Sequence, residues 1–278
     1  MRKEHCKMNI RLSTIPLIIS LFFVVSCGST KQFQPSQLDR ELTIDGNLSD
    51  WNTGKTLFDE REQANYYSAY DEDFLYIYID IKSAFKDASV RRSGLTVYLS
   101  DDEEMRKSIG VGLPAGTFNL LRDYPNAFSE FTRDDEWMNQ PENRELLEDL
   151  SEELFDRVMI VERSDGDNDP SYGFVDPSQL EVDGMEIAVN PDNRTIGLEM
   201  KIPRDGSSIY GFSGDQVWLG FAIEPPDFRI QGSDEYSAAS NTQRDRYGNR
   251  TQQPRSNRTD MAQSLGKMER WHVIQFED

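Results

Sequence analysis

The sequence predicts an all-β protein, a β-sandwich with a helical insertion. Short segments in which apolar and polar residues alternate recur along the 278 residues, and we count eight or nine of them. Turn-forming stretches such as Asn190–Asn193 separate these segments, which is typical of antiparallel sheets. The length allows one large all-β domain or two small ones, and we expect a single domain from residue 41 to residue 278.

The N-terminus has the features of a secretory signal. Four basic residues lie within 2–11, and an uncharged, mostly apolar segment follows from Leu12 to Val25. This segment is shorter than the ~20 residues that a membrane-spanning helix needs. We therefore expect residues 1–26 to be a signal peptide that is removed.

The run Val24–Cys27 resembles the lipobox of bacterial lipoproteins, in which a small residue precedes a cysteine. The resemblance implies that Cys27 is acylated and becomes the first residue, so that lipid attaches the chain to a membrane. Gly28 in the next position fits sorting to the outer membrane, on either its periplasmic or its surface face. We expect residues 27–40 to be a tether between the lipid and the domain.

The composition argues against several classes of function. The chain has 50 acidic and 30 basic residues and a net charge of −20, so nucleic acid is not an expected partner. Cys6 would leave with the signal and Cys27 would carry lipid, which excludes disulfides, thiolate nucleophiles and cysteine metal sites. His272 is then the last histidine, and its place in an alternating segment favours a structural role. We therefore expect a protein that is not an enzyme.

The folded part is expected to begin at Leu42–Gly46. A hairpin should follow, because two β-type runs, 66–70 and 75–82, flank the acidic turn 71–73. In the second run every other residue is Leu or Ile, so one face of that strand should lie in the core. Further strands are expected at 95–99, 158–161, 185–189, 196–202, 217–223 and 271–276.

A helical insertion, about 101–157, is expected to interrupt the strands. Pro141 suits a first helical turn. Four leucines then recur at helical spacing and should pack on a core: Leu146, Leu147, Leu150 and Leu154.

A second irregular region, about 229–267, holds few large aliphatic side chains. With little apolar area to bury, it is expected to be a disordered loop. Five arginines lie between residues 244 and 258, and they would contact either the acidic surface of the protein itself or an acidic partner.

Two segments resemble a known family. Ile44–Trp51 (IDGNLSDW) and Tyr70–Ile79 (YDEDFLYIYI) resemble the start of family 9 carbohydrate-binding modules and of the wider DOMON-like sandwich group. Ile196–Pro203 and Gly220–Ile223 look like later strands of the same family. The resemblance implies a β-sandwich that binds a carbohydrate or another small ligand without catalysis. Trp51, within the opening motif, is expected to lie in the core.

Sugar binding in such modules usually needs exposed aromatic rings that stack on pyranose faces. Five aromatic residues are candidates, because we expect them on the strand faces opposite the aliphatic rows: Tyr66, Tyr70, Tyr76, Tyr78 and Trp218. The alternative is that these rings lie beneath a loop or a helix.

The acidic loop around residue 167 suggests a structural calcium site. Asp165, Asp167 and Asp169 alternate in a turn-rich stretch, and calcium takes six to eight oxygen ligands. Some family 9 modules contain structural calcium, so the resemblance favours this site. The alternative is a solvated acidic loop, because Pro170 and Asp176 depart from the EF-hand pattern.

We therefore predict an outer-membrane lipoprotein that binds a glycan or another small ligand. The alternative is an envelope scaffold that presents its loops to a protein partner and has no small ligand. A carboxylate-dependent glycosidase is a remote alternative, which would need two carboxyl groups facing each other across a cleft.

Overall fold

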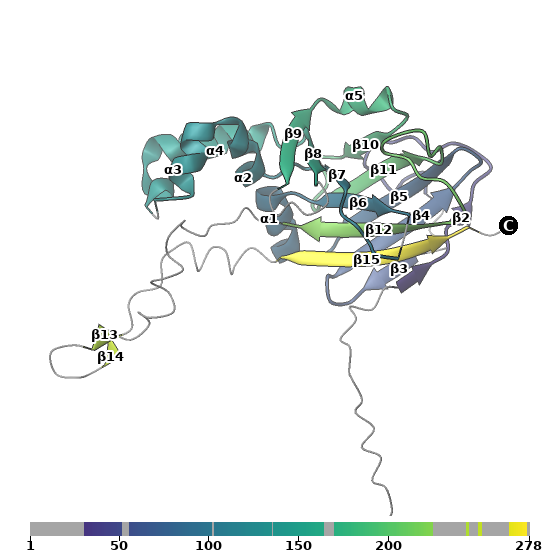
Figure 1. Ribbon diagram of the computed structural model, residues 1–278, viewed down its shortest axis with the longest axis horizontal. Coiled ribbons are helices and arrows are strands. Elements are labelled where there is room, and N and C mark those ends of the chain that lie inside the picture. The colour runs from purple at the N-terminus through teal and green to yellow at the C-terminus, as the bar shows by residue number, and fades with distance from the viewer. Residues whose placement is uncertain are drawn as a thin grey trace, which may run out of the picture.

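A computed structural model describes residues 31–51, 56–101, 103–134, 136–163, 170–224, 243–244, 250–251 and 267–276. The predicted signal peptide and Cys27 lie outside these ranges, as does most of the region 229–267. Two β-sheets stack face to face (Figure 1), which confirms the predicted all-β sandwich. Within the described ranges, no helix has the length and apolar character needed to cross a membrane.

The first layer, sheet A, has seven strands. Their spatial order is β1 (Lys31–Phe33), β15 (Met268–Gln275), β12 (Gln216–Ile223), β6 (Thr96–Ser100), β7 (Ile109–Gly112), β8 (Val158–Glu162) and β9 (Ser171–Val175). All neighbours pair antiparallel except β1 and β15, which are parallel.

The second layer, sheet B, has six strands. Their order is β10 (Glu186–Val189), β11 (Gly197–Pro203), β5 (Phe74–Ile81), β4 (Ala64–Tyr70) and β2 (Ser36–Gln37), with β3 (Thr56–Asp59) also paired to β4. A separate two-stranded ladder joins β13 (Gln243–Arg244) and β14 (Arg250–Thr251).

The main core lies between the sheets, because every other residue of β5 is aliphatic and faces the opposite sheet. Leu75, Ile77, Ile79 and Ile81 are at most 2% exposed and belong to this core. β4 and β5 form the predicted antiparallel hairpin around the acidic turn. Burying each such aliphatic side chain contributes about 1.5–3 kcal/mol, so a one-residue slip of this strand would be strongly disfavoured.

The N-terminal residues expected to form a tether include two short strands. β1 pairs with β15 and β2 pairs with β4, and the Phe33 side chain is 7% exposed in the main core. The expectation of a tether through residue 40 is therefore wrong for these strands. Runs of two or three residues are too short to show an alternation in the sequence.

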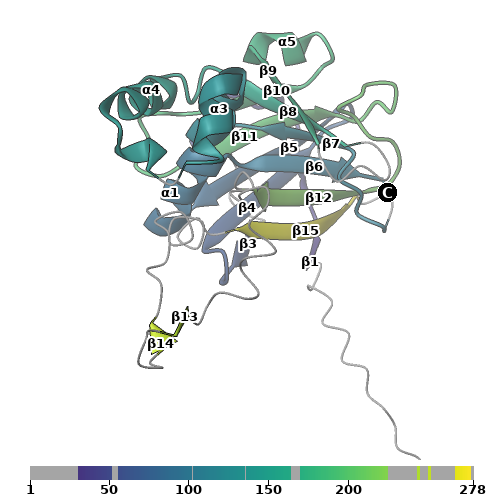
Figure 2. The ribbon, with the colours of Figure 1, turned by 60° about the vertical axis from the view of Figure 1, so that its left-hand side comes forward.

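The helices are short and gather mainly between β7 and β8. They are α1 (Ala84–Ser93), α2 (Thr117–Leu120), the 3₁₀ turn η1 (Leu121–Asp123), α3 (Pro125–Phe131), the 3₁₀ turn η2 (Trp137–Asn139), α4 (Pro141–Glu152) and α5 (Pro177–Glu181). Helices α3 and α4 lie together beside the sheets (Figure 2).

The helical region has an apolar cluster of its own. Leu150 and Leu154 pack there with Trp137, and the cluster reaches Met159 and Val161 of β8. Pro141 is in the first turn of α4, as predicted. β7 falls inside the range expected for the insertion but is a strand of sheet A, so the helical part begins only after residue 112.

Candidate functional site

The outer face of sheet B is covered by residues 38–51, which we call the N-terminal cover. Trp51 packs edge-on against Tyr67 and Tyr78, with ring centroids 6.3 and 6.0 Å apart. Tyr76 is 0% exposed and Tyr78 is 3% exposed in the same cluster. The Tyr78 hydroxyl donates to the Gly46 carbonyl oxygen over 3.2 Å. These two predicted sugar contacts therefore lie beneath the chain's own N-terminal residues.

Glu199, on β11, holds the N-terminal cover in place. Its Oε1 accepts a hydrogen bond from Trp51 Nε1 at 2.7 Å, and its Oε2 accepts from the Gly46 and Asp45 amides at 2.8 and 3.0 Å. The side chain is fully buried, and this burial raises the pKa of Glu199 to about 7, against the opposing effect of the three donors. Trp51 is buried as predicted, and its indole nitrogen has a specific structural partner.

Gly46 allows the cover to approach sheet B closely. Its φ is +73°, a left-handed conformation that favours glycine. A Cβ at this position would lie 2.2 Å from the backbone nitrogen of Asn190. The opening motif thus serves a structural role in this chain, because its glycine, tryptophan and Asp45 amide all fit around one buried carboxyl group.

Tyr66 and Tyr70 point into the sandwich rather than away from it. Tyr66 is in register with Ile79, and Tyr70 is in register with Leu75, so both share the face of β5 that forms the core. Tyr66 lies 4.6 Å from the His272 ring, centroid to centroid, and both side chains are 2% exposed. The expectation that these two tyrosines lie opposite an aliphatic row is wrong, because antiparallel pairing aligns them with the aliphatic row of β5. His272 lies in the core, as expected.

Trp218 lies on the outer face of sheet A but is 7% exposed. The five predicted aromatic residues are therefore all at most 8% exposed and are divided among three different surfaces. A ring must present a free face to stack on a sugar. The structure does not bring these rings together into one binding platform.

A cluster of charged residues occupies part of the outer face of sheet A. The Tyr98 ring lies against Gly110, and its hydroxyl donates to Glu224 Oε2 at 2.5 Å. Lys107 and Arg163 bind the same carboxylate at 2.8 and 3.1 Å. Burial opposes ionisation of Glu224, yet the hydrogen bonds from Lys107 and Tyr98 hold its pKa below the ordinary value. Lys107 also binds Glu269 Oε2 at 2.8 Å, so the cluster pairs two cations with two carboxylates, and it covers Tyr98, which is 0% exposed.

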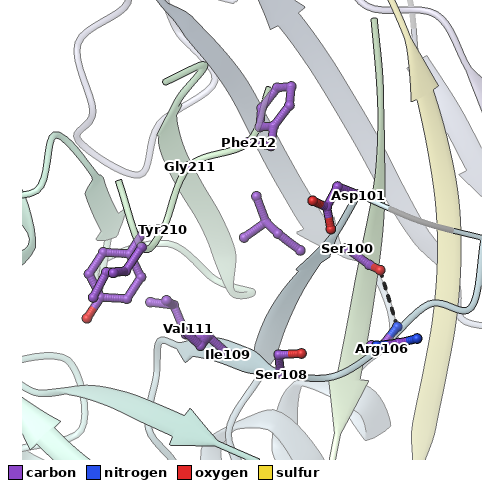
Figure 3. Close-up of a pocket in the computed structure, with 11 residues that line it drawn as sticks. Ser100, Asp101, Arg106, Ser108, Ile109, Val111, Tyr210, Gly211 and Phe212 are labelled. Carbon is purple, nitrogen blue, oxygen red and sulfur yellow. Dashed lines mark hydrogen bonds between the residues drawn. The ribbon is translucent and has the colours of Figure 1, made fainter. Parts of the chain in front are cut away.

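The open site is a cleft of about 260 Å³ at one end of the sandwich, which we call the end cleft (Figure 3). It forms where β6 and β7 diverge, because their paired register ends at Tyr98 and Gly110. The loop between β11 and β12 closes the opposite side. The lining residues are Leu99, Ser100, Asp101, Arg106, Ser108, Ile109, Val111, Ile209, Tyr210, Gly211 and Phe212.

One wall of the end cleft is apolar and aromatic. Ile209 is 61% exposed, which is unusual for a large aliphatic side chain, and Tyr210 is 8% exposed. Phe212 stacks on Phe276, with centroids 5.6 Å apart and planes 16° apart. A Cβ at Gly211 would lie 2.3 Å from the Asp205 carbonyl oxygen, so the loop is folded tightly on itself. This wall is therefore held in place before any ligand binds.

The other side of the end cleft is polar. Figure 3 shows the Asp101 carboxylate directed toward the space between the walls, and this side chain is exposed. Ser100 Oγ accepts from the Arg106 amide at 3.2 Å, and Arg106 Nε donates to Glu104 at 2.8 Å. In the described parts of the chain, no hydrogen bond or ion pair joins the Asp101 carboxylate to another group. Asp101 is thus an acceptor available to a ligand.

The end cleft was not predicted from the sequence. Its walls come from residues 99–111 and 209–212, which are about a hundred positions apart and meet only in the folded chain. One feature of the sequence could have indicated the cleft: Ile209–Phe212 is an apolar and aromatic stretch within a Ser-, Asp- and Gly-rich loop. Large apolar residues in such a loop favour either packing or binding.

The predicted calcium ligands Asp165, Asp167 and Asp169 lie outside the described residues, so this site stays a prediction. Among the residues that the structure describes, no group of three or more His, Cys, Asp and Glu side chains is placed to hold a metal ion.

No protein-family model and no curated protein matches the chain. Among solved structures, the chain is similar to a family 9 carbohydrate-binding module from Caldicellulosiruptor kristjanssonii in complex with glucose, with 12% identity and a TM-score of 0.34 over 89% of this chain and 96% of that chain. A family 9 module from the same organism in complex with cellotriose gives 11% identity and a TM-score of 0.33 over 89% of this chain and 94% of that chain. A likeness at these values does not identify binding residues, which must come from the contacts of this chain.

Proposed function

We propose that this protein binds a glycan without catalysis and that the end cleft holds one sugar unit. The observation that supports this is the pairing of the exposed Ile209 side chain with the Asp101 carboxylate, which has no partner among the described residues, across a cleft of about 260 Å³. This volume is just below the ~300–1,000 Å³ of pockets for drug-sized ligands. The size favours a single ring or the end of a chain over a long oligosaccharide.

The two walls match the two kinds of surface on a sugar ring. The C–H face of a pyranose is apolar and would pack on the exposed Ile209 side chain, which removes apolar area from water. The ring hydroxyls would donate to Asp101 and exchange hydrogen bonds with Ser108. A charged acceptor strengthens such bonds, so Asp101 should account for much of the affinity.

The residues that line the cleft fit binding without catalysis. Among its described lining residues, Asp101 is the one carboxylate, whereas glycoside hydrolysis generally uses two carboxyl groups about 5–9 Å apart. We further propose that Cys27 is acylated and holds the chain on the outer membrane, so that the cleft would capture glycan at the envelope.

One observation favours the scaffold alternative. The outer face of sheet B, with its aromatic residues, is covered by the chain itself. In a scaffold, the exposed loops would contact an envelope partner, and the end cleft would bind a side chain of that partner. The exposed Asp101, which has no partner among the described residues, favours the glycan, because ring hydroxyls can donate to a carboxylate at a solvent-exposed rim.

The test is a calorimetric titration of the purified full chain with a glycan panel that begins with glucose and cellotriose. We expect saturable binding that is lost in Ile209→Asp and weakened in Asp101→Asn. Val182→Asp is the matched control, because Val182 is 87% exposed and does not line the cleft. Absence of binding by every glycan, or equal binding by Ile209→Asp and the control, would contradict the proposal.

A further inference from the structure

Arg122, in η1, lies over two aromatic rings from different elements. Its guanidinium carbon is 3.9 Å from the ring centroid of Tyr172 on β9 and 4.7 Å from that of Phe128 on α3. Rings at these distances attract a cation through their faces and restrict its orientation. The guanidinium of Arg122 is thus positioned by packing rather than by an acidic side chain.

No acidic partner meets this cation in the part of the chain that the structure describes. No hydrogen bond or ion pair of Arg122 occurs there, and its Nε is buried without a partner. Burial lowers the pKa of Arg122, although arginine stays protonated in proteins. The chain has 50 acidic residues, so a partly buried arginine that meets none of those described is unusual.

Arg157 provides an internal comparison. It also lies over an aromatic ring, with its guanidinium carbon 5.2 Å from the centroid of Phe174. Unlike Arg122, it binds a carboxylate, because its terminal nitrogen is 2.6 Å from Asp123 Oδ2. Two arginines therefore share the aromatic contact, and within the described residues only Arg157 also has an ionic partner.

We infer that Arg122 is an anion-binding residue whose partner is a ligand oxyanion, with the carboxylate of an acidic sugar as the favoured source. A planar guanidinium binds a carboxylate through two parallel N–H donors, and rings that stack on its faces do not use these donors. The anion would restore the electrostatic balance that burial of the cation disturbs. The site is independent of the end cleft: Tyr172 packs in the helical cluster on the outer side of sheet A, whereas the cleft is floored by core-facing residues of β7.

The test titrates the full chain with sodium glucuronate and uses glucose as the uncharged comparison. Arg122→Gln should weaken glucuronate binding by ~10-fold or more, because it removes the charge and the paired donors. Arg157→Gln is the matched control and should bind as the wild type does. Binding should also weaken as the ionic strength rises.

A second arm identifies the source of the oxyanion. Competition by sodium sulfate would assign the site to oxyanions in general, and glucuronate binding without such competition would assign it to carboxylates. Circular dichroism of each variant checks folding, and Arg122→Lys, which keeps the charge, should retain part of the affinity. Equal losses in Arg122→Gln and Arg157→Gln, or no saturable binding by either anion, would overturn the inference. Ile209→Asp should leave the Arg122-dependent part of glucuronate binding unchanged, that is, the part that Arg122→Gln removes, which separates this site from the glycan proposal.

Discussion

The outer face of sheet B and the end cleft both contain aromatic side chains, yet of the two only the cleft exposes a large apolar side chain to solvent. On sheet B, Tyr76 and Tyr78 lie beneath Trp51 and are at most 3% exposed. In the cleft, the Ile209 side chain is 61% exposed beside Tyr210. Aromatic residues at every other position of a strand therefore indicate that one face of the strand is apolar. They do not indicate whether that face is exposed to solvent.

The two regions also differ in how they are held together. The N-terminal cover is fixed by a buried carboxyl group that accepts three hydrogen bonds and by an edge-to-face aromatic cluster. The cleft is bounded by loops whose polar rim faces solvent. Changes in the cover should therefore alter stability, and changes in the cleft should alter binding.

The largest expected effect is that of Trp51→Ala. This change removes a buried aromatic ring and leaves Glu199 Oε1 without its donor, so the free energy of unfolding should fall by about 3–5 kcal/mol. Urea denaturation of both proteins measures the difference. Phe85→Ala is the control, because Phe85 is 54% exposed and its loss should change stability by about 0.5 kcal/mol or less. A loss of less than about 1 kcal/mol for Trp51→Ala would show that the cover is not fixed by this residue.

The next effect is a dependence of stability on pH. The folded pKa of Glu199, about 7, is raised above its unfolded value near 4.5, so its favourable contribution is fully present below pH 4.5 and is lost as pH rises through 7. The stability of the wild type relative to Glu199→Gln should fall by roughly 3 kcal/mol between pH 4.5 and pH 8. Denaturation of both proteins across this range measures it. A relative gain for the wild type as pH rises would mean that the three N–H donors, rather than burial, dominate the titration.

A smaller loss is expected for Gly46→Ala. The new Cβ would meet the Asn190 backbone at 2.2 Å, and the residue would keep an unfavourable positive φ, so stability should fall by about 1–3 kcal/mol. Gly214→Ala separates the two causes, because Gly214 has a φ of +106° and open space around its Cβ position. Equal losses in the two variants would show that the close approach of the cover has no energetic role.

The smallest expected effect on stability is that of Ile209→Asp. Its side chain is largely exposed, so the free energy of unfolding should change by about 0.5 kcal/mol or less, while glycan binding is lost. The comparison with Val182→Asp should show equal thermal midpoints and different calorimetric titrations. A large drop in the midpoint for Ile209→Asp alone would mean that the residue is structural.

The fold was predictable because its central strands are long enough to show a period. Leu75 to Ile81 alternate without interruption, and Trp51 belongs to a motif whose glycine and tryptophan have clear structural uses. β1 and β2 were missed because they are too short, and the faces of Tyr66 and Tyr70 were assigned wrongly because strand register is a tertiary property. The end cleft could not be predicted for the same reason, since Asp101 and Ile209 come together only through folding.

The most direct test of the central claim is an NMR titration of the full chain, with isotope-labelled isoleucine methyl groups and tyrosine rings, against the same glycan panel. We expect the Ile209 methyl and Tyr210 ring signals to shift saturably, while those of Tyr76 and Tyr78 do not move. Saturable shifts at Tyr76 and Tyr78, with none at Ile209, would place the ligand under the N-terminal cover and rule out the end cleft as the glycan site.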